Sequence, residues 1–95
     1  MQEISKEKIN SVIELFSNGN FDAALNTLED LSKDYPKESL LFNIKGACYA
    51  GLGQLDNAVK SYQDAIIINP NYSKAHYNLG GAFHEIGALD ESVQS

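Results

Sequence analysis

The stretch that decides the fold is residues 46–70, which read GACYAGLGQLDNAVKSYQDAIIINP. Apolar residues recur at helical spacing on both sides of Gly53. Gly53 can adopt the left-handed backbone conformation that ends a helix without a clash from a Cβ. Asn69 precedes Pro70, and a residue before proline is pushed out of the helical region. The stretch therefore predicts two helices that are separated by a tight turn and followed by a loop.

The signals in this stretch return along the chain at an interval of 34 residues, as Gly19, Gly53 and Gly87 show. The same interval separates the members of three further sets, which are Ser5, Ser39 and Ser73; Asp22, Asp56 and Asp90; and Pro36 and Pro70. Self-similarity at one period in this range is typical of a helical-repeat architecture. The sequence predicts one all-α domain over residues 1–95, with repeats of about 5–38, 39–72 and 73–95, the last of them truncated.

The same pattern predicts where each helix begins and ends. The first repeat predicts helices over about 5–18 and 22–34, and the second over about 40–52 and 55–68, with Ser39 as an N-cap. The third repeat predicts a helix over 73–86, a turn at Gly87 and a second helix of about seven residues, a length that is marginal on its own.

The short last helix predicts an open C-terminal end, because repeat arrays normally end in a polar capping helix. We expect four side chains to stay partly bare and two more to have little to pack on, namely Leu79, Ala82, Phe83 and Ile86, and then Leu89 and Val93. Copies of the chain are expected to self-associate through this end, as a homo-oligomer. The sequence is also expected to be the beginning of a longer protein.

Many positions of the second and third repeats agree with one known pattern, namely Phe42, Gly46, Tyr49, Ala58, Tyr62, Ala65 and Pro70, and then Leu79, Gly80 and Phe83. This pattern resembles the tetratricopeptide repeat family. The resemblance implies about two and a half helix-turn-helix units stacked in a right-handed α-solenoid. It also implies a concave groove, lined mainly by the first helix of each repeat, in which a noncatalytic scaffold binds a peptide or partner protein. The first repeat departs from the pattern at Lys8, Ser11 and Val12.

On the geometry of that family, the candidate binding residues are Asn10, Asn43, Lys74, Tyr77, Asn78 and His84, with Gly81 and Glu85 also facing the groove. An asparagine amide both donates and accepts hydrogen bonds, which suits a grip on a peptide backbone. Asn10 and Asn78 share one register, but Ile44 interrupts the series between them. The alternative reading is that these asparagines are solvated surface residues. Recognition of a terminal carboxylate is not expected, because convergent cations are missing.

Composition narrows the classes of partner. The net charge is −6 and the chain contains no arginine, which disfavours nucleic acid and anionic membranes as partners. No apolar run approaches the ~20 residues of a membrane helix, and the N-terminus lacks a signal-peptide pattern. A cytoplasmic location is therefore expected.

Side chains that could carry chemistry are few. His76 and His84 are badly spaced for a metal pair on one helix, so we expect no metal and no cofactor. We expect His76 to pack as an aromatic residue and Cys48 to be a small buried thiol. Helix glycines cost about 1 kcal/mol each, so Gly80 and Gly81 predict tight packing or a groove contact.

Two functional hypotheses follow from the sequence. The first is the noncatalytic interaction scaffold. The second is the N-terminal self-association or targeting domain of a larger enzyme, such as a glycosyltransferase or a sulfotransferase. A free-standing enzyme is not expected, because the sequence offers no constellation of acid, base and nucleophile.

Overall fold

The computed structural model describes the backbone of residues 4–94 and the side chains of residues 4–88. It contains, in chain order, α1 (Lys6–Ser17), α2 (Phe21–Asp34), α3 (Ser39–Gly51), α4 (Leu55–Ile68) and α5 (Ser73–Gln94). Over residues 4–94 there is no strand. The predicted all-α class is confirmed, and four of the five helices lie within a residue or so of their predicted bounds.

The helix ends show which of the predicted cap and turn residues begin or end a helix. Gly19 and Gly53 have φ values of 79° and 78°, so both predicted glycine turns are confirmed. Ser5 caps α1, because its Oγ accepts a hydrogen bond of 3.2 Å from the backbone N–H of Lys8. The predicted cap at Ser39 is wrong: Glu38 is the N-cap of α3. The backbone N–H of Leu41 donates to the carbonyl of Glu38 (3.1 Å), and this bond starts the helix one residue earlier.

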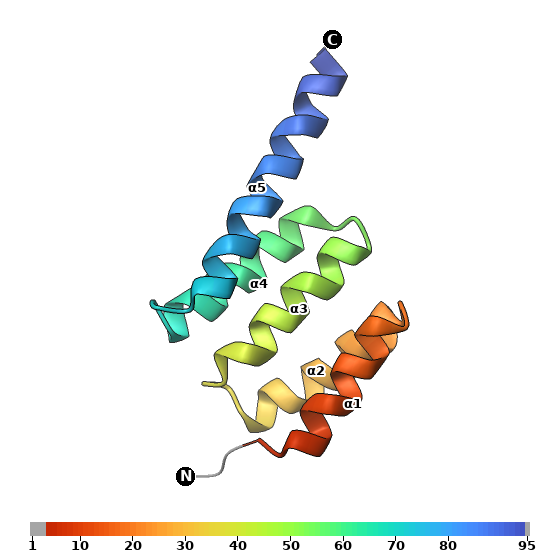
Figure 1. Cartoon of the computed structure of the whole chain (residues 1–95), viewed down its shortest axis with the longest axis vertical. Coiled ribbons are helices and arrows are strands. Elements are labelled where there is room, and N and C mark those ends of the chain that lie inside the picture. Colours follow the sequence, from red (N-terminus) through yellow and green to blue (C-terminus); the bar gives the residue numbers. More distant parts are fainter. Residues whose placement is uncertain (1–3, 95) are drawn as a thin grey trace.

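The helices form a stack in which each element packs on the next one along the chain (Figure 1). The stack measures 51 × 29 × 18 Å. One core cluster joins α1, α2 and α3 through Val12, Ala24, Leu28, Leu31, Leu41, Ile44 and Cys48. A second joins α4 and α5 through Ala58, Tyr62 and Ala82. Stability therefore comes from contacts between neighbouring helices, as in other solenoids.

The closest approach within the second repeat is between Gly46 of α3 and Tyr62 of α4. A Cβ placed on Gly46 would overlap the ring of Tyr62, which is only 4% exposed. Ala58 of α4 is fully buried. The predicted need for small residues where the two helices of this repeat meet is confirmed.

The third repeat differs from its prediction at Gly87. The helix α5 runs without interruption through Gly87 to Gln94, so the predicted turn is wrong. A continuing helix adds one backbone hydrogen bond per residue, whereas a separate helix of about seven residues would have to nucleate again. Figure 1 shows the second half of α5 projecting beyond the rest of the stack.

Burial along α5 only partly follows the prediction. Phe83 is 51% exposed, as expected for a bare end, but Ala82 is buried against α4, contrary to the prediction. His76 is exposed, and its Nε2 lies 2.8 Å from the carbonyl oxygen of Pro70, so its predicted packing role is wrong. Among the described side chains, none lies within 4 Å of a Cβ placed on Gly80, so the predicted tight packing is not found there. The predictions for Leu89 and Val93 fall outside the described side chains.

Candidate functional site

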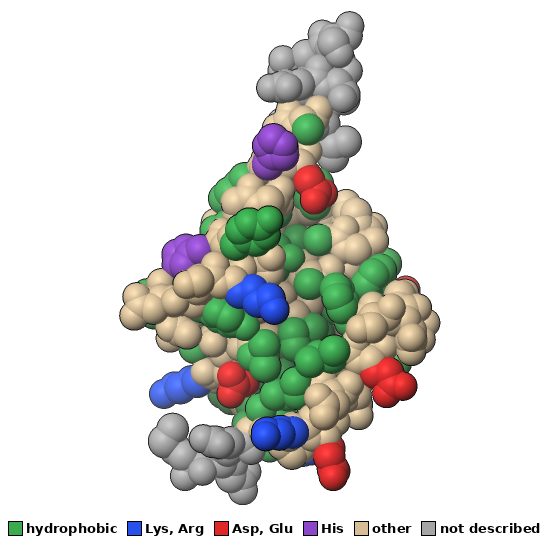
Figure 2. Space-filling view, viewed as in Figure 1, with side chains coloured by type: hydrophobic (Ala, Val, Ile, Leu, Met, Phe, Trp, Pro, Cys, Tyr) green, Lys and Arg blue, Asp and Glu red, His purple; other side chains and the backbone are tan. Residues whose placement is uncertain are grey.

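The first helices of the three repeats, α1, α3 and α5, share one face of the stack. Figure 2 shows hydrophobic side chains gathered over the middle of this face, with a basic side chain among them and other charged side chains around them. Tyr77 on α5 is 82% exposed and Ile13 on α1 is 43% exposed. Exposed aromatic side chains of this kind are enriched where proteins bind partners, because they offer a large area at a small entropic cost.

Two asparagines join α3 to α5 across this face. The Nδ2 of Asn78 donates a hydrogen bond of 3.1 Å to the Oδ1 of Asn43. Asn43 is buried, and Asn78 is half-buried. Burial raises the pKa of the nearby Tyr72 hydroxyl, and the amide of Asn43 opposes that increase. Asn43 thus positions Asn78, which still has a second N–H donor and a carbonyl acceptor on its amide.

Beside Asn78 lies a hollow of about 300 Å³, which we call the α5 hollow. Its lining comes from three helices: Ala50 of α3, Tyr62 of α4, and Tyr77, Asn78, Gly81, Ala82 and Glu85 of α5. Burial raises the pKa of the Tyr62 hydroxyl, and Cys48 and the carboxylate of Glu85 add to the increase. Tyr62 and Glu85 thus both line the hollow, one from α4 and the other from α5.

The structure separates the six predicted binding residues into groups. It brings Asn43 and Asn78 together and places Asn78 and Tyr77 at the α5 hollow. Lys74 is exposed in the first turn of α5, and His84 is exposed further along it without lining the hollow. Asn10 is exposed on α1.

Two lining residues, Tyr62 and Ala82, were missed as site residues. The sequence predicts Tyr62 only as a packing residue, and its position in the second helix of its repeat gives no sign of a groove contact. Tyr62 lines the hollow because of the way α5 packs against α4. The sequence pattern of a single repeat does not specify that packing.

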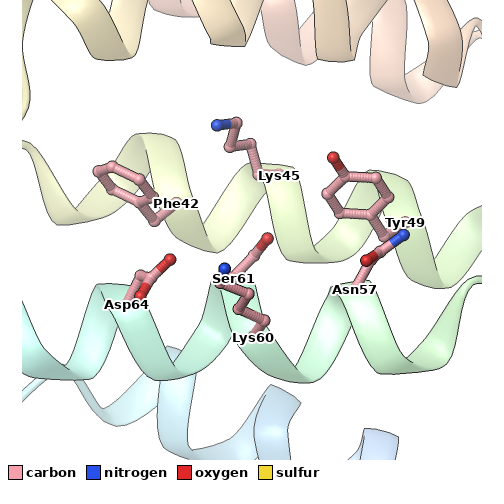
Figure 3. A pocket seen from close by; sticks show the side chains of 7 residues that line it. All are labelled: Phe42, Lys45, Tyr49, Asn57, Lys60, Ser61 and Asp64. Atoms are coloured by element: carbon pink, nitrogen blue, oxygen red, sulfur yellow. The ribbon is translucent and has the colours of Figure 1, made fainter.

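A second hollow, of about 260 Å³, lies between α3 and α4 (Figure 3). Its lining comprises Phe42, Lys45 and Tyr49 of α3 and Asn57, Lys60, Ser61 and Asp64 of α4. Lys45 is already engaged, because its Nζ lies 3.0 Å from a carboxylate oxygen of Glu29 on α2 and 5.3 Å from the ring centroid of Phe42. The hydrogen bond and charge of Lys45 hold the pKa of Glu29 below its usual range. Lys45 thus links the first and second repeats.

The described part of the chain offers little for catalysis. Cys48 is fully buried, and burial raises the pKa of its thiol to about 11, so the reactive thiolate is suppressed near neutral pH. The prediction of a small buried thiol is confirmed. Within the described residues, no three His, Cys, Asp or Glu side chains gather where they could hold a metal ion. None of the helices, over the residues described, combines the length and apolar character that a membrane crossing requires.

The helices pair in antiparallel fashion, and each packs against the next one along the stack. This arrangement defines the molecule as an α-solenoid. A family model for the TPR repeat matches residues 46–87, and a model for the tetratricopeptide repeat matches residues 11–38. The chain therefore belongs to the tetratricopeptide repeat family.

Two similar proteins show how far the likeness in sequence extends. The peroxisomal targeting signal receptor of Candida glabrata is 27% identical over 79 residues, covering 83% of this chain and 13% of the receptor. Human tetratricopeptide repeat protein 6 is 37% identical over 65 residues, covering 68% of this chain and 12% of that protein. The chain thus spans about an eighth of the length of these relatives.

The solved structure of the MamA RS-1 ArsTM double mutant superposes with a TM-score of 0.79 at 21% identity. The match covers 92% of this chain and 49% of that chain. At this identity the likeness shows a shared fold. The predicted solenoid architecture is thereby confirmed.

Proposed function

We propose that this chain is a noncatalytic protein–protein interaction scaffold, which binds a peptide segment of a partner along the face formed by α1, α3 and α5. The observation that carries the proposal is the exposed ring of Tyr77, which stands beside the amide of Asn78 at the edge of the α5 hollow. Membership of the tetratricopeptide repeat family supports it, as does the likeness to a protein named as a receptor for a targeting signal.

In the proposed complex, neighbouring side chains make different contacts with the bound segment. Tyr77 supplies apolar contact area, and the amide of Asn78 exchanges hydrogen bonds with the backbone of the bound segment. Asn43 holds the Asn78 amide in place through the bond between α3 and α5. Because the Asn78 amide is already fixed in place, it loses less conformational entropy when it binds the segment.

The test begins with peptides selected on the chain from a random display library. Replacing Tyr77 and Asn78 together by alanine is expected to weaken the selected peptides by about tenfold or more, since interface residues of this kind contribute over 1 kcal/mol each. A matched control replaces Ile67 and Gln63 of α4, which are also an exposed apolar residue and an exposed amide. An unchanged affinity in the double variant, with far-ultraviolet circular dichroism retained, would rule out this face.

We also propose that two copies of the chain associate through the outer side of α5. Phe83 is half exposed there, and the surface over Gly80 is open. Phe83 is 51% exposed, so covering the rest of its side chain contributes roughly 1 kcal/mol, about half of what full burial gives. Sedimentation at several concentrations is expected to show a self-associating species that Phe83→Gln shifts toward monomer. A strictly monomeric chain at high concentration would count against the proposal.

A further inference from the structure

We infer that the α5 hollow receives a cationic side chain, lysine or arginine, from the bound partner. This inference rests on the proposed function and adds the chemistry of one recognised side chain. Three independent features of the hollow support it: the space over its floor, the aromatic ring at its rim and the carboxylate on its wall.

The floor of the hollow leaves room for a long, thin side chain. Ala50, Gly81 and Ala82 contribute almost no side-chain volume, and nothing lies within 4 Å of a Cβ placed on Gly81. A hollow of about 300 Å³ has room for a single long side chain. The methylene stem of a lysine or arginine could lie along this apolar floor while its charged head reaches the rim.

The rim of the hollow carries an aromatic ring that is available to a ligand. Tyr77 is 82% exposed, so most of its ring is free to meet a partner. The face of an aromatic ring attracts a cation within about 6 Å of its centroid. The same chain shows this geometry elsewhere, where Lys45 stands 5.3 Å above the ring of Phe42.

The carboxylate of Glu85 sets the sign of the charge that the hollow favours. Among the described residues Glu85 makes no ion pair, whereas Glu29 pairs with Lys45. On α5 itself the lysine is Lys74, eleven positions earlier and thus about 16 Å away along the helix axis. The chain carries a net charge of −6, which adds to the attraction of a partner's cation.

Other side chains fit the hollow less well. A carboxylate from the partner would be repelled by Glu85. An aliphatic side chain would cover the floor but would take water from Glu85 without supplying a counter-charge. A lysine or arginine satisfies the apolar floor, the ring and the carboxylate together.

The direct test uses single-residue probes followed by nuclear magnetic resonance. The probes are the N-acetyl amides of arginine, lysine, norleucine and glutamate, each titrated into the isotope-labelled chain. The arginine and lysine probes are expected to give saturable shifts at Asn78, Gly81 and Ala82, and the norleucine and glutamate probes are not. Equal shifts from norleucine and arginine, or the absence of any saturable shift, would overturn the inference.

Matched variants show whether the charge and the ring act as stated. Glu85→Gln is expected to weaken the arginine probe by about fivefold, and Tyr77→Leu by about threefold, as for partly exposed ion pairs and cation–π contacts. Asp30→Asn, at an exposed position on α2, removes the same unit of charge from a different helix and should change nothing. An arginine affinity unaffected by Glu85→Gln would contradict the inference.

The peptides selected on the chain separate this inference from the proposed function. Suppose that the peptides bind the face formed by α1, α3 and α5, but that no basic residue of theirs contributes an affinity that Glu85→Gln weakens. The inference then fails and the proposed function stands. If no peptide binds the α1, α3 and α5 face while the arginine probe still occupies the hollow, the proposed function fails and the cation site stands.

Discussion

Gly46 and Gly80 occupy the same position one repeat apart, yet their surroundings are opposite. The ring of Tyr62 fills the space over Gly46, whereas no described side chain lies within 4 Å of a Cβ placed on Gly80. The aromatic residues three positions later differ in the same sense, because Tyr49 is half-buried and Phe83 is 51% exposed. One sequence signature thus produces a closed contact in the second repeat and an open surface in the third.

The difference comes from what the chain does after each first helix. At Gly53 the backbone turns, and α4 returns along α3 to bury Ala58 and Tyr62. At Gly87 the helix continues, so within residues 4–94 no second helix lies back on the outer side of α5. The second helix of a repeat therefore completes the packing of the first. The sequence pattern of the first helix does not by itself determine whether its side chains are buried.

The largest expected effect is at the closed contact. Gly46→Ala would place a methyl group against the buried ring of Tyr62, which has little room to move. We expect the free energy of unfolding to fall by about 1–3 kcal/mol, as for other overpacked contacts. Urea unfolding followed by circular dichroism measures this change. A variant as stable as the parent would mean that Tyr62 does not pack on Gly46 as described.

The corresponding change at the open position should have the opposite sign. Gly80→Ala meets no neighbour and replaces a glycine in an exposed part of a helix. We expect the free energy of unfolding to rise by about 0.5–1 kcal/mol, because alanine loses less backbone entropy than glycine when the helix forms. The same urea titration applies. The titration is made on monomer defined by sedimentation, so that a second copy does not cover Gly80. Destabilisation of this monomer by Gly80→Ala would contradict the open surface.

The smallest expected effect is at the link between the first two repeats. The folded chain holds the pKa of Glu29 below its ordinary value of 4.5, mainly through Lys45. A lowered pKa means that the ion pair contributes stability above pH 4.5 and that this contribution is lost as the pH falls through the folded pKa. Because Glu29 is largely exposed, the contribution is at most a few tenths of a kcal/mol.

The matching variant is Glu29→Gln, which removes the carboxylate of the ion pair. Its free energy of unfolding should lose this part of the dependence on pH. It should also lose most of the dependence on salt concentration that the ion pair contributes. Unfolding curves at pH values on either side of 4.5 provide the comparison. An acid dependence identical in the parent and in Glu29→Gln would show that the Lys45 pair contributes nothing.

The sequence predicted the fold well where the signal is local and repeated. The turns at Gly19 and Gly53 and the bounds of α4 follow from glycine and proline chemistry within a few residues. The turn at Gly87 was predicted from the same signal but is wrong. A glycine permits a turn without requiring one, and the segment that would have returned is short.

The candidate site was predictable only in part, for a similar reason. The resemblance to the tetratricopeptide repeat family was enough to propose Tyr77 and Asn78 for the groove. It could not show that Asn43 would be buried as the acceptor of the Asn78 amide, because that bond joins residues 35 positions apart. Nor could it show Tyr62 reaching the α5 hollow from α4, since this contact depends on how two repeats are packed.

The central claim is that α3 and α4 form a closed pair, whereas no helix of the described residues packs on the outer side of the second half of α5. Residue-resolved amide hydrogen exchange, on monomer defined by sedimentation, tests it most directly. The account predicts the slowest exchange in α3 and α4 and faster exchange in α5 from Gly80 onward. Protection of that half of α5 equal to that of α3 would contradict the account.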